Sequence, residues 1–353
     1  MAKEIRIASH VIGKNNPAFI VAEVGVNHNG DLGLAKQLVD TAKSVGASAV
    51  KFQVFNAKDL VTENAPLASY QKKVVLGRSH FELLRKLQLS RTDFEFLFDY
   101  CHKKKIIFLA TPFDSGSADF LQQLGVHAFK ISSGDLTNLP LLRQVANFKK
   151  PIILSTGMST LKEVGDAVEN IYSAKNRRLI LLHCTSNYPT EYRNVNLRAM
   201  CSLRKKFSVS VGYSDHTRGI EVSVAAVAMG ACVVERHLTL DRSLPGPDHA
   251  ASLDPLEFER LVRAIRNIES AMGNGIKKPC RSETEVKNVA RKSIVASQNI
   301  AKGTVLSEKI LAFKRPGTGL SPSLLRNILG KRTKRKLKKD TLVRVKDLAR
   351  LGS

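Results

Sequence analysis

The sequence predicts an α/β fold: a closed (β/α)₈ TIM barrel followed by a small, mostly β domain. Apolar runs of strand length recur eight times with helical patterns between most of them, and this rhythm stops near residue 273. The runs are Phe19–Val24, Ala49–Val54, Ile106–Ala110, Ala128–Ile131, Ile152–Leu154, Leu179–Cys184, Val209–Tyr213 and Ala231–Glu235. Continuous apolar runs are typical of parallel strands covered on both faces, and eight of them favour a closed barrel. An open doubly wound sheet is the alternative, but no GxGxxG motif follows the first run.

The remaining elements follow in chain order. Residues 1–17 predict an N-terminal hairpin, with Ile5–Ala8 and Val11–Gly13 as its strands, at the start of a barrel domain spanning 1–273. Apolar residues at helical spacing predict helices over Leu34–Val45, Phe94–Cys101, Ser117–Leu124, Val164–Tyr172, Ile220–Met229 and Glu257–Met272.

The second domain begins after a linker. Glycine, proline and lysine dominate the start of residues 274–289, which predicts a connecting segment. Residues 290–353 then form the expected small domain, with short β pieces at Ser293–Ala296, Val305–Leu306, Ile310–Phe313 and Leu342–Val345.

Composition narrows the class of protein. No run of the 353 residues approaches the ~18 apolar residues of a transmembrane helix, and Met1–Glu4 opens no apolar signal core. The five cysteines have no CxxC spacing, which favours reduced thiols in the cytoplasm over a disulfide framework or a zinc ribbon.

The net charge of +25 is concentrated near the C-terminus. Residues 281–353 hold 19 Lys/Arg against 5 Asp/Glu, a net of +14, which leaves 25 − 14 = +11 for the rest. Much of the excess lies in the basic run 331–339. A run of this kind can bind nucleic acid or another polyanion, but no aromatic residue interleaves it to stack on bases. A solvated face is therefore the favoured interpretation, and neither a membrane nor a nucleic acid is an expected partner.

Polar residues follow every predicted barrel strand, where a barrel of this kind builds its active site. Lys51, Gln53 and Lys130 lie within or at the edge of apolar runs, and a buried lysine is costly unless it is paired. Two such lysines pointing up one barrel indicate an anionic ligand. The short turns 132–134 and 155–157 add hydroxyls and backbone N–H groups that suit phosphate oxygens. The sequence therefore predicts a phosphorylated or carboxylated substrate.

Two histidines leave neighbouring strand ends. His216 follows the seventh run and His237 follows the eighth, so their imidazoles can meet over one small volume. Imidazoles with Asp and Glu beside them suit a divalent ion such as Mn²⁺ or Mg²⁺. Two unrelated surface histidines are the alternative. Glu23 and Glu235 are candidates for moving a proton or assisting the ligands. Asp248 lies in a stiff Pro-Gly-Pro loop, and a turn-forming Asp is the alternative to a site residue there.

Ten motifs, in the same order along the chain, resemble the bacterial sialic acid (N-acetylneuraminate and other nonulosonate) synthases. They run from about residue 19 to 319: Ala22–Gly30, Val50–Gln53, Ala110–Asp114, Lys130–Asp135, Ser155–Met158, His183–Pro189, Gly212–Thr217, Glu235–His237, Gly246–His249 and Lys314–Gly319. The resemblance implies that the small domain is an antifreeze-like (SAF) domain. It also implies a condensation of phosphoenolpyruvate with an N-acetylated amino sugar, giving a nine-carbon 2-keto acid and phosphate.

The resemblance assigns roles to individual residues. It implies that His216 and His237 bind Mn²⁺ or Mg²⁺ and act in catalysis with Glu23 and Glu235. The implied phosphoenolpyruvate contacts are Lys51, Gln53, Thr111, Lys130, Ser133, Ser155 and Ser214. The implied sugar contacts are Glu23, Ser186, Tyr188, Asp248 and Arg315. Arg315 would serve the other subunit's site in a domain-swapped homodimer.

The identity of the sugar depends on residue 186. N-acetylmannosamine is the first acceptor that the resemblance implies, but N-acetylneuraminate-forming members commonly have Asn where this chain has Ser186. Relatives that make legionaminic acid often have Ser there, and their acceptor is 2,4-diacetamido-2,4,6-trideoxymannose. Two other classes stay open: a Schiff-base aldolase using Lys51 or Lys130, and a polyanion-binding protein using the basic C-terminal domain.

Overall fold

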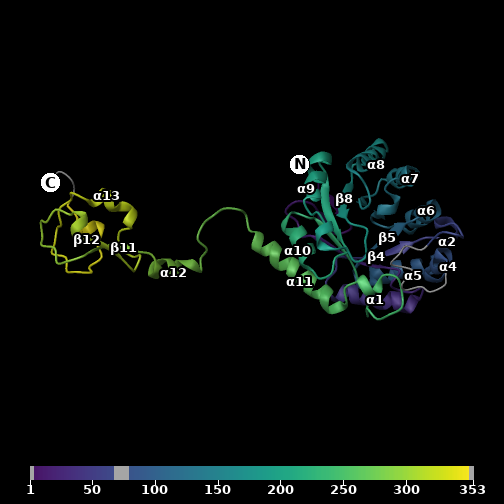
Figure 1. Ribbon diagram of the computed structural model, residues 1–353, viewed down its shortest axis with the longest axis horizontal. Helices are drawn as coiled ribbons and strands as arrows, with labels where there is room; N and C mark the ends of the chain where they lie inside the picture. Colours follow the sequence, from purple (N-terminus) through teal and green to yellow (C-terminus); the bar gives the residue numbers. More distant parts are fainter. Residues whose placement is uncertain (1–3, 67–78, 350–353) are drawn as a thin grey trace. The chain divides into compact units, whose positions relative to one another are not determined.

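The computed structural model describes residues 4–66 and 79–349, so residues 1–3 and 350–353 of the two expected domains lie outside it. The chain divides into two compact units, Met1–Gly273 and Asn274–Ser353 (Figure 1). Within the described residues, no helix combines the length and apolar character needed to cross a membrane.

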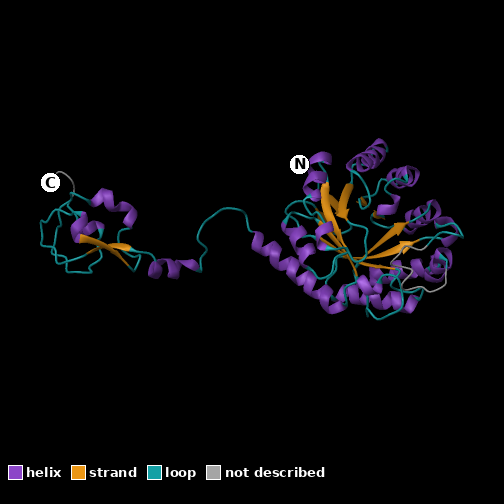
Figure 2. Cartoon of the chain, viewed as in Figure 1, coloured by secondary structure: helices purple, strands orange, loops and turns teal. Residues whose placement is uncertain are grey.

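The first unit contains a closed barrel of parallel strands in the order β10-β3-β4-β5-β6-β7-β8-β9, which confirms the predicted fold class (Figure 2). The strands are β3 (Phe19–Gly25), β4 (Ala49–Val54), β5 (Ile107–Pro112), β6 (Phe129–Ile131), β7 (Ile152–Ser155), β8 (Leu179–Cys184), β9 (Ser210–Asp215) and β10 (Val233–His237). β9 and β10 extend two residues beyond the predicted ends. Pairing of Arg236 with Asp215, and of His237 with Glu23, continues the ladder to these positions.

Helices surround the barrel strands, as Figure 2 shows. They are α1 (Leu32–Ser44), α2 (Ala57–Leu60), α4 (His80–Leu87), α5 (Arg91–Lys104), α6 (Ser115–Leu124), α7 (Leu139–Asn147), α8 (Leu161–Ser173), α9 (Ala199–Phe207), α10 (Glu221–Ala228) and α11 (Pro255–Met272). Several begin at a side chain that accepts a hydrogen bond from the first turn. Ser90, Thr160 and Asp254 do so within capping boxes, which satisfy backbone donors that would otherwise lack partners.

The two faces of each strand belong to different parts of the core. On β4, Phe52 and its alternate neighbours pack outward against the helices, whereas Ala49 faces the barrel interior. The lower interior is apolar and is closed by a hairpin of β1 (Ile5–Ile7) and β2 (His10–Ile12), whose isoleucines join that interior cluster. Lys51 and Gln53 lie above Ala49 on the same face, because side chains alternate along a strand. The interior is therefore apolar below and polar above.

The second unit is built from short elements. β11 (Ser293–Ala296) and β12 (Leu311–Lys314) pair antiparallel, and α13 (Leu325–Ile328) follows. Val305 and Leu342 form isolated bridges where short strands were predicted, and Val345–Asp347 is a 3₁₀ turn. Two more 3₁₀ turns of this unit cover Glu308–Ile310 and Pro322–Leu324, and the first unit has 3₁₀ turns at Ser133–Asp135, Tyr192–Asn194 and His249–Ala251.

Part of the segment expected to be a linker is helical. α12 (Glu283–Ala290) occupies its second half and buries none of its residues. It is held to the unit's later residues by backbone contacts: Gly317 N donates to Asn288 O at 2.7 Å. In the basic run, Lys334, Lys336 and Lys338 are exposed, whereas the alternating Leu337 is buried in the unit's core.

Candidate active site

A cavity of about 430 Å³ lies in the first unit, lined by residues at and beyond the carboxyl ends of the barrel strands. Every site residue predicted from the sequence lines it except Arg315. The lining residues among them are Glu23, Lys51, Gln53, Thr111, Lys130, Ser133, Ser155, Ser186, Tyr188, Ser214, His216, Glu235, His237 and Asp248. The chain therefore brings together side chains from eight strands and the turns that follow them.

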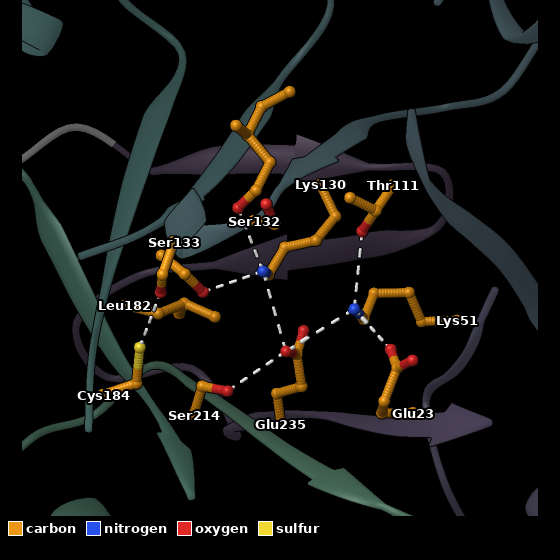
Figure 3. Close-up of polar contacts among 12 residues, drawn as sticks. Glu23, Lys51, Thr111, Lys130, Ser132, Ser133, Leu182, Cys184, Ser214 and Glu235 are labelled. Carbon is orange, nitrogen blue, oxygen red and sulfur yellow. Dashed lines mark hydrogen bonds and ion pairs between the residues drawn. The ribbon is translucent and has the colours of Figure 1, made fainter. Parts of the chain in front are cut away.

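Two buried lysines and two buried glutamates form the floor of this cavity (Figure 3). Glu235 Oε1 lies 3.6 Å from Nζ of both Lys51 and Lys130, and Lys51 also forms an ion pair with Glu23. Gln53 Nε2 donates to Glu23 Oε1 at 3.1 Å. Each buried charge thus has a partner of opposite sign, as a site that excludes water requires.

Hydroxyl groups extend this cluster. Lys130 Nζ donates to Ser155 Oγ at 2.8 Å, and Ser214 Oγ donates to Glu235 Oε1 at 3.1 Å. Thr111 Oγ1 lies 3.4 Å from Lys51 Nζ (Figure 3). Ser133 Oγ accepts from Gly157 N at 3.0 Å, so the turns after β6 and β7 are joined beside the lysines. The cluster offers ammonium and hydroxyl donors to one anionic ligand.

Burial and neighbouring charges shift the pKa values of these lysines and glutamates in different directions. Burial lowers the pKa of Lys130, whereas for Lys51 burial is outweighed by Glu23 and Glu235, which raise its pKa. Burial opposes ionisation of Glu235, but Lys130 and Lys51 hold its pKa at about 2. Burial raises the pKa of Glu23, with Lys51 opposing the shift. Glu235 is therefore a fixed anion, while Glu23 is suited to carry a proton.

The two histidines from β9 and β10 face each other across the cavity, with ring centroids 5.6 Å apart. His216 Nδ1 lies 2.8 Å from Thr185 O, a carbonyl that only accepts, so this nitrogen carries the proton and Nε2 has a free lone pair. His237 Nδ1 is buried and has no hydrogen-bond partner, and it lies 3.7 Å from Asp248 Oδ2. Tyr188 packs on both rings, at 4.2 and 5.6 Å between centroids.

These histidines fit a divalent metal. Burial lowers the pKa of His216 to about 4, with His237 adding to the shift, and burial together with Lys51 lowers that of His237 to about 3. Both imidazoles are thus neutral near pH 7, the form that binds metals. Within residues 4–66 and 79–349, no group of three or more His, Cys, Asp or Glu gathers in metal-binding geometry. Among the described residues, the protein therefore offers a metal ion two imidazoles, one with an unpartnered ring nitrogen, and not a complete set of four ligands.

Asp248 belongs to the cavity wall. It is buried, and burial raises its pKa to about 7, with Glu23 adding to the shift. Its loop is held by His249, whose Nδ1 lies 2.7 Å from Thr239 Oγ1 and whose Nε2 lies 3.3 Å from Asn29 Oδ1. The position of Asp248 thus depends on buried contacts beyond the turn that the sequence indicated.

Some residues lie elsewhere. Arg315 is exposed in the second unit, where its Nε donates to Ala290 O at 2.9 Å. His183, at the end of β8, turns to Val195 O at 2.7 Å and does not line the cavity.

The periodicity of the sequence does not predict helix α4, although four of its residues line the cavity: His80, Leu83, Leu84 and Leu87. Its signal was the Ser79–Glu82 capping box ahead of these leucines.

A closed parallel barrel with a lysine–glutamate cluster and a histidine pair at its carboxyl end defines an enzyme acting on anions. The NeuB family model matches residues 38–277, and the SAF domain model matches residues 291–349. The chain belongs to the NeuB family.

Relatives extend the match over nearly the whole chain. It is 48% identical to the N,N'-diacetyllegionaminic acid synthase of Campylobacter jejuni, covering 92% of this chain and 98% of that protein. It is also 48% identical to the synthase of the same name from Legionella pneumophila, covering 91% of each. The crystal structure of an N-acetylneuraminic acid synthetase from Leptospira borgpetersenii matches with a TM-score of 0.72 at 37% identity, over 81% of this chain and 95% of that one.

These findings establish the reaction type. The chain is a phosphoenolpyruvate-condensing transferase that forms a C–C bond, of the sialic and nonulosonic acid synthase group. Synthases of this family are metal-dependent.

Proposed function

We propose that this enzyme condenses phosphoenolpyruvate with 2,4-diacetamido-2,4,6-trideoxymannose to give N,N'-diacetyllegionaminic acid and phosphate. The observation that carries the proposal is 48% identity over more than nine-tenths of two proteins named as synthases of that acid. N-acetylmannosamine, the acceptor first expected, has weaker support, because the sialic acid synthetase is 37% identical. Ser186, the residue that leaves the identity of the sugar open in the sequence, lines the cavity.

Phosphoenolpyruvate binds at the lysine cluster in this proposal. Its carboxylate and phosphate bring negative charge to Lys51 and Lys130, and the hydroxyls of Thr111, Ser133 and Ser155 donate to its oxygens together with Gln53. Ser214 joins these donors when its hydroxyl turns from Glu235 to the ligand. The fixed negative charge of Glu235 keeps both lysines oriented. Support comes from the burial of every charge in the cluster, because a binding site for a small dianion must replace its hydration shell.

His216 and His237 hold the divalent metal, Mn²⁺ or Mg²⁺, in this proposal. When bound, the metal supplies Lewis-acid polarisation of the acceptor's aldehyde oxygen. The neutral rings and the unpartnered His237 Nδ1 support this role. Tyr188, packed on both rings, fixes their orientation and excludes water from one side.

The reaction joins C3 of phosphoenolpyruvate to the acceptor's aldehyde carbon. The aldehyde oxygen gains a proton and becomes a hydroxyl, and water adds its oxygen to C2. As the C2 carbonyl forms, the C2–O bond to phosphate breaks, and the two water protons go to the aldehyde oxygen and to the departing phosphate. Glu23, with its raised pKa, lies where it can carry one of these protons, and Asp248 accepts from the sugar hydroxyls. Ser186, Tyr188 and Arg315 complete the acceptor's contacts, with Arg315 supplied by the partner chain of a domain-swapped homodimer.

We also propose that the enzyme is cytoplasmic. All five cysteines are free: Cys101, Cys184, Cys201, Cys232 and Cys280. Free thiols suit a reducing compartment, and Cys184 lines the cavity, where oxidation would obstruct it.

A competition between acceptors tests the proposal. The purified enzyme is given phosphoenolpyruvate, Mn²⁺ and equal amounts of N-acetylmannosamine and 2,4-diacetamido-2,4,6-trideoxymannose, and the products are measured by mass spectrometry. The mass of N,N'-diacetyllegionaminic acid should dominate. Predominance of N-acetylneuraminic acid would reject the proposed acceptor and restore the first expectation.

A further inference from the structure

The lining of the cavity is polar on one side and largely apolar on the other. Over β6 to β8 its lining is polar, with Lys130, Ser133 and Ser155. Over β3 to β5 the upper lining is apolar apart from His80, and it is formed by side chains from α4 and from the turns after β3 and β5. These apolar lining residues, here called the leucine wall, are Val26, Leu83, Leu84, Leu87 and Phe113. Lys51, Gln53 and Thr111, on β4 and β5, belong to the lysine cluster that takes phosphoenolpyruvate, so the leucine wall beyond these strand ends is left to face the other substrate.

The leucine wall is a packed structure. Leu83 and Leu87, one helical turn apart, are 5% and 4% exposed and form one cluster with Val26 and Phe55. Phe55 meets Phe113 edge to face, with ring centroids 6.3 Å apart. Leu84 packs against the same cluster but is only half-buried, so part of its side chain is left to the cavity.

Helix α4 is also fixed against the barrel. Gln88 Oε1, just after the helix, accepts from Ala57 N at 2.9 Å. Gly30 has φ +76°, and a Cβ there would lie 2.3 Å from Lys86 O, so the turn after β3 touches the backbone of α4. A wall fixed at both these points can discriminate by shape, because its side chains cannot withdraw from a ligand that does not fit.

Apolar side chains facing a polar cavity gain free energy only when a ligand covers them. We propose that the leucine wall, through Leu84 in particular, selects the acceptor by binding its methyl groups. This inference rests on the proposed function. The trideoxy sugar carries a C6 methyl and a second acetamido methyl, where N-acetylmannosamine has hydroxyl groups. The wall lines the same cavity as Glu23 but lies beyond the strand ends, so an acceptor whose aldehyde reaches the lysine cluster extends its C4 to C6 end toward the wall.

The expected size of the effect follows from transfer free energies. Covering one methyl group is worth about a fourfold change in binding, and a poorly filled apolar pocket discriminates by about tenfold. Two methyl groups therefore suffice for a clear preference. Leu84→Gln keeps the length of the side chain and helix propensity but places an amide in the wall.

The test compares kcat/KM for the two acceptors in the wild type, Leu84→Gln and Leu60→Gln. Leu60 is a matched control, because it is half-buried against the same cluster but does not line the cavity. We expect Leu84→Gln to lower kcat/KM for the trideoxy sugar by about tenfold and that for N-acetylmannosamine by about twofold at most. Leu60→Gln should change both equally, and Leu84→Met should retain the preference.

The outcomes separate the two proposals. A wild type that prefers N-acetylmannosamine rejects the proposed acceptor, and with it the selection by methyl groups. A wild type that prefers the trideoxy sugar, with the same preference in Leu84→Gln, leaves the proposed function standing and overturns the role of the wall. If Leu84→Gln unfolds, Leu84→Ser and Leu84→Met supply the comparison, with the KM for phosphoenolpyruvate and the Tm showing that each variant is folded.

Discussion

Asp215 and Arg236 form a buried ion pair, with Oδ2 and Nη1 2.7 Å apart, and each directly precedes one of the two cavity histidines. Both side chains are at most 2% exposed. Asp215 also accepts from Ser223 Oγ at 2.5 Å and from Thr217 N at 2.8 Å, while Arg236 Nη2 donates to Thr217 O at 2.8 Å. The pair thus joins the ends of β9 and β10 to α10, and fixes the backbone from which His216 and His237 project.

Breaking this pair should loosen the histidines. Arg236→Met leaves the Asp215 carboxylate buried without its cation, so we expect the free energy of unfolding to fall by about 3–5 kcal/mol. Mn²⁺ affinity, measured by calorimetry on the folded fraction, should fall by about 10- to 100-fold. Lys104→Met is the control, because its pair with Asp40 is solvent-exposed and its attraction is screened by water. Unchanged metal affinity in a folded Arg236→Met would contradict the positioning role.

The histidines themselves should determine metal binding. His216→Ala and His237→Ala each remove one imidazole, so each should reduce turnover steeply, and excess sugar should not restore it. Calorimetry with Mn²⁺ alone provides a readout that does not depend on activity. His127→Ala is the control, since His127 is exposed and does not line the cavity. Near-normal turnover in either site variant would show that the metal assignment is wrong.

Lys130 should act on phosphoenolpyruvate and not as a Schiff-base nucleophile. Lys130→Met removes a cation and leaves Glu235 with one ammonium partner, so the KM for phosphoenolpyruvate should rise by about 100-fold or more, as loss of a buried charge–charge contact predicts. Borohydride added during turnover should trap no substrate on the wild type. Covalent trapping detected by mass spectrometry would instead support the aldolase alternative.

Arg315 should affect the sugar more than the chemistry. It is exposed in its own unit, and its proposed contact is with the acceptor, so Arg315→Ala should raise the sugar KM more than it lowers kcat. The KM for phosphoenolpyruvate should stay constant. Equal losses in kcat and kcat/KM would instead place Arg315 in stabilisation of the transition state.

Sequence patterns predicted the barrel well because each strand is a buried apolar run, and polar residues at the strand ends are exceptions to that pattern. Lys51 and Lys130 stood out for this reason, and the structure pairs both with Glu235. The pattern could not show where strands stop. Asp215 and His237 continue β9 and β10 because of pairing with distant strands, which no local signal reveals.

The features that sequence patterns did not predict depend on tertiary contacts. The eight residues of α4 are too few for a convincing helical period, and their leucines gain a role only because Gly30 and Ala57 hold the helix against the barrel. The glycines and the one proline before α12 indicate a linker, and this local signal hides the helix that follows. His183 is a residue type common in active sites and lies at a strand end, but its ring nitrogen contacts Val195 O. Only the folded structure shows that its side chain points away from the cavity.

Phosphate release from phosphoenolpyruvate tests the central claim most directly. The purified enzyme is assayed with Mn²⁺ and a panel of N-acetylmannosamine, its 6-phosphate and 2,4-diacetamido-2,4,6-trideoxymannose, each with and without EDTA. Our account predicts release that requires a sugar, is fastest with the trideoxy sugar, and is abolished by EDTA. Release that proceeds without any sugar, or that persists undiminished in EDTA, would contradict it.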